Sequence, residues 1–295
     1  MTKRHKPPRV GDSPVVRRSL IAFVLLVGAL IIGAPLLVIF IQAFSQGWKT
    51  YAATLGHPDT RHAIFLTVVT SLIAVPVNTL FGIAAAWAIT KFDFRGKRLL
   101  TVIIELPFSI SPIVAGVSLL FVYGLQGLFG PVLQEAGIKV LFALPGIVLA
   151  SLFVTAPFVA RELIPLMQAQ GRDLEEAATS LGASGWHTFF SVTFPNIRWA
   201  MLYGVVLCNA RVMGEFGAVS VVSGNIRGQT NTLPLHIELL YHDYQTVGAF
   251  AAASILTFLA LVTIVAKVLL ERRGAGRRHG SALAGPAVFS REASQ

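Results

Sequence analysis

The sequence predicts an all-helical membrane protein with six transmembrane helices. Of its 295 residues, 54% are hydrophobic and only 13% are charged, and the mean hydropathy is +0.70. Because roughly 25% of the residues in soluble domains are charged, this composition excludes an ordinary soluble protein. Six apolar runs are each long enough to cross a hydrocarbon core of about 30 Å as a helix, which satisfies its own backbone hydrogen bonds in lipid.

Polar connections separate the six predicted spans. The spans run from Ser19 to Phe44, His62 to Thr90, Leu99 to Gly124, Val140 to Pro165, Trp199 to Ser223 and Thr246 to Leu270. The first run follows basic residues, as in a secretory signal, but it is about twice as long as the apolar region of a signal and lacks a small-residue cleavage site. We therefore expect an uncleaved first helix.

Positive charge is distributed unevenly over this arrangement. Most of the 24 Lys and Arg residues lie on one side of the six spans. The exceptions are Lys49, Arg61, Lys139 and Arg227 on the other side, and Arg211 inside the fifth span. The positive-inside rule therefore places both termini and the connection 166–198 in the cytoplasm. The net charge of +10 indicates orientation, and we expect no nucleic-acid partner.

The stretch LEEAATSLGASGWHTFFSVTFPN, residues 174–196, is a polar island between the fourth and fifth spans. Four side chains at i, i+3, i+4 and i+7 form one apolar stripe: Leu174, Ala177, Ala178 and Leu181. Gly182 permits a left-handed turn, Ser184 can cap a second short helix, and Pro195 is expected to break that helix. The pattern predicts a cytoplasmic docking element without a catalytic group, or alternatively a loop packed on its own bundle.

The spacing in this stretch resembles the EAA motif of the membrane subunits of ATP-binding-cassette importers. That motif reads Glu-Ala-Ala, three residues, Gly, nine residues and Ile-x-Leu-Pro. The matching residues here are Glu176, Ala177, Ala178, Gly182, Val192, Phe194 and Pro195, with Val192 and Phe194 as conservative departures. The resemblance implies the type I permease (MetI-like) fold and makes 171–198 the coupling loop. Its ATPase-docking residues would be Glu176, Ala177, Ala178, Leu181, Gly182 and Pro195.

A second resemblance concerns the solute. Gly214 to Ala218, preceded by Asn209-Ala210-Arg211, resembles importers of tetrahedral oxyanions. The wider likeness, from about Ser19 to Arg273, is to the W-type subunits of sulfate/thiosulfate permeases. It implies sulfate or thiosulfate as the solute. A permease for molybdate or tungstate remains an alternative, because selectivity can reside in a separate binding protein.

The family resemblance also implies partners. The sequence contains no G-x-x-x-x-G-K-[ST] phosphate loop and no cytoplasmic segment large enough for a nucleotide domain. The chain would therefore be no enzyme and hold no cofactor, while separate ATPase subunits bind ATP and Mg. We further expect a T-type permease subunit in a heterodimer, an extracytoplasmic sulfate- or thiosulfate-binding protein, and a location in the inner (plasma) membrane bilayer.

We expect three regions along the chain. Residues 1–18 form a basic cytoplasmic tail, residues 19–271 form the six-helix transmembrane domain, and residues 272–295 form a disordered cytoplasmic tail. The one cysteine, Cys208, excludes an internal disulfide and a cysteine-based metal cluster. His236 and His242 have no ligand partners at metal spacing, so no metal site is predicted.

Ionisable residues inside the spans are costly and usually face a partner or a wet cavity. Arg211 and Glu215, at i and i+4 with Asn209 alongside, are close enough to pair. They either hold the structure or a subunit interface, or contact the anion, and self-pairing favours the structural role. Glu105 and Arg161, at similar depth in spans three and four, are predicted to form a salt bridge.

Two serines lie at a predicted break in the third span, and two other classes of membrane protein are compatible with parts of the sequence. Ser109 and Ser111, between Pro107 and Pro112 in a broken helix, either line the pathway or bond back to their own helix. A secondary transporter would use Arg211 and Glu215 as a proton relay without an ATPase, which the EAA-type motif argues against. A membrane enzyme would need a polar catalytic cluster, and the sequence offers none.

Overall fold

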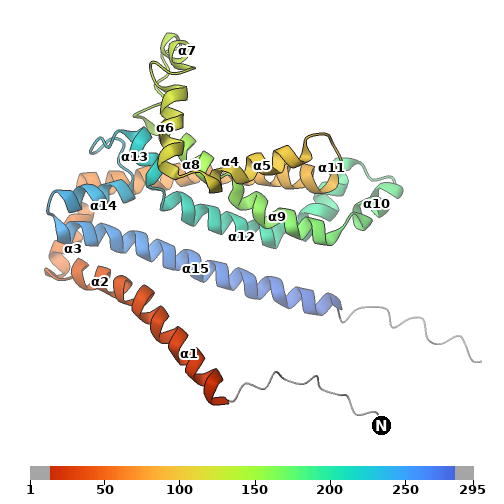
Figure 1. Cartoon of the computed structure of the whole chain (residues 1–295), viewed down its shortest axis with the longest axis horizontal. Helices are drawn as coiled ribbons and strands as arrows, with labels where there is room; N and C mark the ends of the chain where they lie inside the picture. The colour runs from red at the N-terminus through yellow and green to blue at the C-terminus, as the bar shows by residue number, and fades with distance from the viewer. Residues whose placement is uncertain (1–13, 283–295) are drawn as a thin grey trace, which may run out of the picture.

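The computed structural model describes residues 14–282, and within that range every regular element is a helix (Figure 1). Four helical stretches are long and apolar enough to cross a membrane: Val15–Ala43, Pro58–Lys91, Leu144–Gln170 and Thr246–Ala266. Two more pass that test only as bent pairs, Lys97–Ser109 with Pro112–Tyr123 at 111° and Gly185–Met213 with Gly217–Ser223 at 51°. The described chain therefore holds four to six candidate spans, and the predicted six counts each bent pair as one.

The first span is the least integrated part of the bundle. It comprises α1 (Pro14–Gly28), a π-helical turn η1 (Ala29–Gly33) and α2 (Ala34–Ala43). The π-turn directly precedes α2, whose second residue, Pro35, lacks an N–H and leaves a carbonyl one turn earlier without its helical donor. In Figure 1, α2 lies beside α15 (Thr246–Ala282), whereas α1 diverges from it, and the most apolar stretch of this span buries no residue.

The 34-residue helix α4 (Pro58–Lys91) is the centre of the bundle. It follows α3 (Gly47–Gly56) and packs against α8 (Leu144–Thr155), α9 (Pro157–Gln170) and α12 (Phe194–Met213). At Gly82 the approach of α9 is so close that a Cβ atom would lie 2.7 Å from the Cβ of Val159. Glycine is therefore needed for this contact rather than for a turn.

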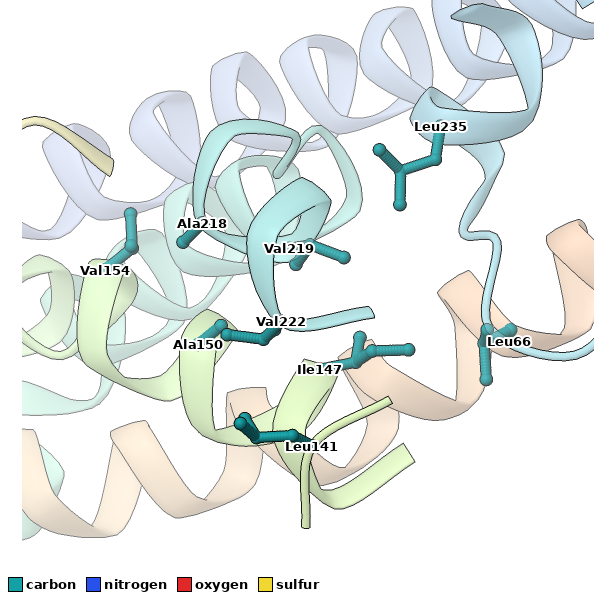
Figure 2. Packing of buried hydrophobic residues seen from close by; sticks show 9 residues of the cluster. All are labelled: Leu66, Leu141, Ile147, Ala150, Val154, Ala218, Val219, Val222 and Leu235. Carbon is teal, nitrogen blue, oxygen red and sulfur yellow. The ribbon is translucent and has the colours of Figure 1, made fainter. Parts of the chain in front are cut away.

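The apolar core lies where helices from distant parts of the chain meet. One cluster joins α4, α8, α13 (Gly217–Ser223) and α14 (Leu233–His242), as Figure 2 shows. Its buried side chains are Leu66, Leu141, Ile147, Ala150, Val154, Ala218, Val219, Val222 and Leu235. A second cluster packs α4 against α9 and α12 around Ala74, Val159, Leu163, Ile197 and Cys208. These contacts fix α12 and α13 relative to α4.

A row of buried polar side chains, which we call the polar seam, runs along one face of α4. It consists of Thr60, Thr67, Ser71 and Asn78, spaced i, i+7, i+11 and i+18. Thr60 bonds the side chain of His236, and Ser71 bonds the side chain of Asn209. Thr67 accepts a hydrogen bond from the backbone N–H of Leu233, and Asn78 donates one to the Thr155 hydroxyl. Such bonds between helices in lipid are worth about 0.6 kcal/mol each.

The third and fifth predicted spans are bent. Helix α5 (Lys97–Ser109) ends at Ser109, and α6 (Pro112–Tyr123) starts after Ile110 and Ser111 in extended conformation. Ser111 precedes a proline, which disfavours helical backbone there. Beyond α6 the short α7 (Gly130–Glu135) protrudes from the bundle (Figure 1). The broken helix expected around Ser109 and Ser111 is present.

The two ends of the chain differ in part from the expected regions. Helix α1 already begins at Pro14, inside the expected basic tail, and α15 remains helical to Ala282, beyond the expected start of the C-terminal tail at 272. The remaining tail segments, 1–13 and 283–295, lie outside the described residues.

Acidic pH should destabilise the packing of α14 on α4. His236, outside the candidate spans, is buried and its Nε2 lies 3.0 Å from the Thr60 hydroxyl. Burial lowers the pKa of His236, so the unfolded chain binds the proton first as the pH falls below about 6.5. We expect thermal unfolding of the purified protein to show a midpoint that drops by about 2–4 °C in this range. His236→Gln should abolish the drop and the exposed His242→Gln should keep it; an unchanged drop in His236→Gln would refute the assignment.

Candidate functional site

The stretch 174–196 forms two short helices with a glycine between them, as the sequence predicts. Helix α10 (Asp173–Ser180) ends before Gly182, whose φ of +87° lies in the left-handed region. Helix α11 (Gly185–Thr188) begins after Ser184, which accepts a hydrogen bond from the backbone N–H of His187. Figure 1 shows α10 and α11 together at one end of the bundle, opposite α3 and α14.

The expectation that Pro195 breaks the second helix is wrong. The chain is helical from Gly185 to Met213, through the π-turn η2 (Phe189–Thr193) and into α12. Proline cannot donate to the carbonyl four residues earlier, which belongs to Ser191 in η2. The wide turn accommodates that missing donor, so the helix continues past the proline instead of ending.

The apolar stripe of α10 faces away from the bundle. No residue of α10 is buried, Leu174 is 56% exposed, and Leu181 directly after the helix is 90% exposed. Trp186 and Phe190 of the following helix are exposed as well, and beside them lies a groove of about 430 Å³ lined by residues including Gly182 and Val192. A loop packed on its own bundle would bury this stripe, whereas here no residue of α10 is buried.

Aromatic and ionic contacts attach this element to the end of α4. The ring of Trp87 lies 4.8 Å from Phe189 and 6.2 Å from Trp186, measured between centroids. The Lys91 ammonium lies 2.7 Å from the Glu175 carboxylate. Farther out, Arg172 and Lys97 both pair with Asp93, and the hydrogen bond from Arg172 is the main reason why the pKa of Asp93 is lowered.

Arg211 and Glu215 lie at the break between α12 and α13 and form the expected pair. Arg211 Nη1 lies 2.8 Å from Glu215 Oε2, without the alignment of a hydrogen bond. The other carboxylate oxygen accepts a hydrogen bond of 3.0 Å from the backbone N–H of Ala218, in the first turn of α13. The Glu215 side chain is 1% exposed and that of Arg211 is 34% exposed. Glu215 thus joins both halves of the bent helix.

Asn209 bonds to the polar seam of α4 and is not part of the Arg211–Glu215 pair. Its side-chain oxygen accepts a hydrogen bond of 2.5 Å from the Ser71 hydroxyl on α4, and its amide nitrogen faces the Met213 sulfur. The asparagine therefore ties α12 to α4 one turn before the break.

The two bent pairs meet at their breaks. A Cβ atom on Gly217, the first residue of α13, would lie 3.0 Å from the Pro112 side chain at the start of α6. Ser109 and Ser111 flank this point, and both are exposed. Within residues 14–282 neither hydroxyl forms a hydrogen bond, so the alternative of bonding back to their own helix is not realised.

The predicted salt bridge between Glu105 and Arg161 does not form in the described part of the chain. The guanidinium of Arg161 instead lies 5.0 Å from the ring centroid of Phe108, one turn beyond Glu105 on α5. Stacking on an aromatic face competes with ion pairing for a planar guanidinium, and at this site the aromatic contact is the one made.

Two features of this arrangement were not predicted from the sequence, the polar seam and the Lys91–Glu175 pair. The polar seam has a detectable signal, because four small polar residues recur on one face of an apolar helix. The pairing of Lys91 with Glu175 has no local signal, since the two residues belong to different connections and meet only through the fold. Among residues 14–282, no group of three or more His, Cys, Asp or Glu side chains is arranged to hold a metal.

Comparison with known proteins identifies the family. Residues 78–275 match the family described as binding-protein-dependent transport system inner membrane component. The sulfate transport system permease protein CysW of Escherichia coli (strain K12) is 54% identical over 254 residues, 86% of this chain and 87% of that protein. The CysW protein of Synechococcus elongatus (strain ATCC 33912 / PCC 7942 / FACHB-805) is 52% identical over 255 residues, 86% of this chain and 89% of that protein.

A solved structure shares the fold. A bacterial alginate ABC transporter, crystallised in complex with an alginate pentasaccharide-bound periplasmic protein, contains a chain that matches with a TM-score of 0.71 at 16% identity. The match covers 87% of this chain and 92% of that chain. The chain belongs to the binding-protein-dependent transport system inner membrane component family, as the matched residues and the high identity to its relatives show.

Proposed function

We propose that this chain is the permease subunit of an ATP-binding-cassette importer that moves sulfate, and thiosulfate with it, into the cytoplasm. The observation that supports sulfate as the solute is the 54% identity to a sulfate transport system permease protein over 86% of the chain. The protein is a multi-pass component of the inner membrane and no enzyme, because a partner subunit hydrolyses ATP. Molybdate or tungstate is the remaining alternative solute.

The proposed topology has six spans with both termini in the cytoplasm. Counting each bent pair as one span supports the number six, and the excess of Lys and Arg on the α10 end supports the orientation. In this arrangement 1–18 and 272–295 are cytoplasmic tails flanking the 19–271 transmembrane domain. The side of α14 and α3 then faces the extracytoplasmic binding protein for sulfate or thiosulfate.

The proposed docking site for the ATPase is the coupling loop 171–198. The exposed apolar stripe of α10 and the groove beside Gly182 support this role, because they offer apolar surface that this chain does not cover. The docking residues are those of the motif: Glu176, Ala177, Ala178, Leu181, Gly182 and Pro195. ATP and Mg would be bound by that partner, and a T-type subunit would complete the membrane heterodimer.

The proposed pathway or subunit interface lies at the paired breaks. Ser109 and Ser111 present hydroxyl groups without fixed charge there, which suits a solute that must be released again. The Glu215 carboxylate already contacts Arg211 and α13, and the Asn209 side chain already bonds to Ser71 of the polar seam. These contacts within the chain support a structural role for both residues. Among Asn209, Arg211 and Glu215, the group best placed to meet an anion or the partner subunit is Arg211, whose side chain is partly exposed.

The solute is tested by competition. The complete complex with its T-type subunit, ATPase and binding protein would be sealed into vesicles, and ATP-driven uptake of radiolabelled sulfate would be measured with excess unlabelled oxyanions. We expect thiosulfate to suppress uptake and molybdate to leave it unchanged. Preferential suppression by molybdate or tungstate would transfer the proposal to those anions.

A further inference from the structure

The Glu175 carboxylate is the point at which α10 is joined to two membrane helices. Its Oε1 lies 2.7 Å from the ammonium of Lys91, the last residue of α4, and accepts a hydrogen bond of 3.1 Å from the hydroxyl of Thr193, the last residue before α12. One side chain of α10 therefore contacts the ends of both α4 and α12.

This contact is sheltered from solvent, unlike the other ion pair that joins the same segments. The side chains of Lys91 and Glu175 are 7% and 19% exposed, whereas those of Arg172 and Asp93 are 39% and 74% exposed. The Lys91 ammonium also donates to the Gly171 carbonyl at 2.5 Å, at the end of α9. Sheltered pairs are less screened by salt and lose more when one partner is removed.

Apolar packing does not provide an alternative link through α10 itself. No residue of α10 is buried, and its large apolar side chain Leu174 points into solvent. Displacement of a helix reaches distant parts of a protein only through packed or bonded contacts. Within α10 the sheltered side-chain contacts toward α4 and α12 are those of Glu175, and directly before the helix Arg172 adds one longer hydrogen bond of 3.5 Å to the Thr90 carbonyl of α4.

The two helices that receive this contact are also bonded to each other. The Ser71 hydroxyl of α4 donates to the Asn209 side chain of α12, and α12 ends at the Arg211–Glu215 pair beside the break. The two helices that Glu175 contacts are therefore tied together between that contact and the point where the two bent pairs meet.

We propose that Glu175 is a positioning residue for energy coupling, whose carboxylate, clamped between Lys91 and Thr193, transmits movement of α10 to α4 and α12. The inference rests on the proposed function, in which α10 docks the ATPase. It assigns a role to a residue that precedes the Glu-Ala-Ala motif, and it concerns contacts within this chain rather than with the ATPase.

The first test compares sulfate imported with ATP hydrolysed in vesicles that contain the complete complex. Glu175→Gln keeps the size of the side chain and its acceptor for Thr193, but it removes the charge. We expect the ratio of sulfate to ATP to fall at least about fivefold while the complex still copurifies. Lys91→Gln, which leaves the docking helix unaltered, should cause the same loss, and the double variant should lose no more than either single one.

Asp93→Asn is the matched control, because it removes the exposed pair with Arg172 that joins the same segments, together with the local pair to Lys97. It should change the ratio by less than about twofold. A wild-type ratio in Glu175→Gln, additive losses in the double variant, or an equal loss in Asp93→Asn would each overturn the inference. Failure of the wild-type complex to import sulfate would count against the proposed function instead.

A second readout needs no transported solute. Spin labels on cysteines introduced at Asp173 of α10 and Leu72 of α4, both exposed, report the distance between the two helices. We expect this distance to stay the same with and without ATP in the otherwise wild-type complex, and to shift with ATP once Glu175→Gln is added. A shift of equal size without Glu175→Gln would show that α10 moves independently of α4.

Discussion

Replacing Gly182 with Asp is expected to reduce ATP-driven sulfate uptake by about tenfold or more, because a carboxylate enters the proposed docking groove and would lose its hydration when the partner docks. The φ of Gly182 is +87°, and a Cβ atom there would meet nothing within 4 Å in this chain. The variant should therefore fold and insert normally. Uptake by vesicles, with copurification of the ATPase as a measure of assembly, checks this.

Two control variants test whether the charge at this position causes that loss. Gly182→Asn tolerates the left-handed conformation and carries no charge, so it should retain most of the uptake. Gly185→Asp places the same charge three residues later, at a position with an ordinary φ and open space, and should retain uptake as well. Uptake by Gly182→Asp within about twofold of wild type would contradict the proposed docking role.

Removal of the Glu215 charge is expected to have the largest effect on stability. Glu215→Gln leaves Arg211 without its partner beside a bend within the membrane domain and weakens the hydrogen bond to α13. Breaking a buried ion pair from one side costs about 3 kcal/mol, which corresponds to a fall in unfolding temperature of about 6–12 °C. Thermal unfolding of the purified complex in detergent would measure it.

The double variant Arg211→Met with Glu215→Met tests the reason for this loss. It removes both charges, so its unfolding temperature should be higher than that of Glu215→Gln. Arg211→Lys then distinguishes the two roles of the arginine: normal assembly with altered apparent sulfate affinity indicates contact with the anion, whereas lost assembly indicates a structural role. An unchanged unfolding temperature in Glu215→Gln would contradict the assigned function of the carboxylate.

The features predicted correctly from the sequence are those with a local signal. Long apolar runs give the candidate spans, and the left-handed turn at Gly182 follows from the motif spacing within a dozen residues. The Arg211–Glu215 contact was also predictable from the sequence, because one turn of helix brings residues i and i+4 together. Its second function, capping α13, depends on the bend after Gly214 and has no equivalent in the spacing.

The features that the sequence did not predict depend on how the helices pack in the tertiary structure. Pro195 by itself predicts a break, but the π-turn before it accommodates the missing backbone donor and the helix continues. Arg161 had two candidate neighbours on α5, Glu105 and Phe108, and only the packing of α5 on α9 selects the ring. The same holds for Lys91 and Glu175, whose distance is set by the whole bundle.

The most direct test of the account is to measure sulfate accumulation in vesicles energised in two separate ways, with ATP alone or with a proton gradient alone. For an ATP-driven importer we expect accumulation with ATP, insensitivity to a protonophore, and loss of accumulation in Gly182→Asp. Accumulation driven by the proton gradient without ATP would contradict it, because a secondary transporter would then be at work and α10 would have no ATPase to serve.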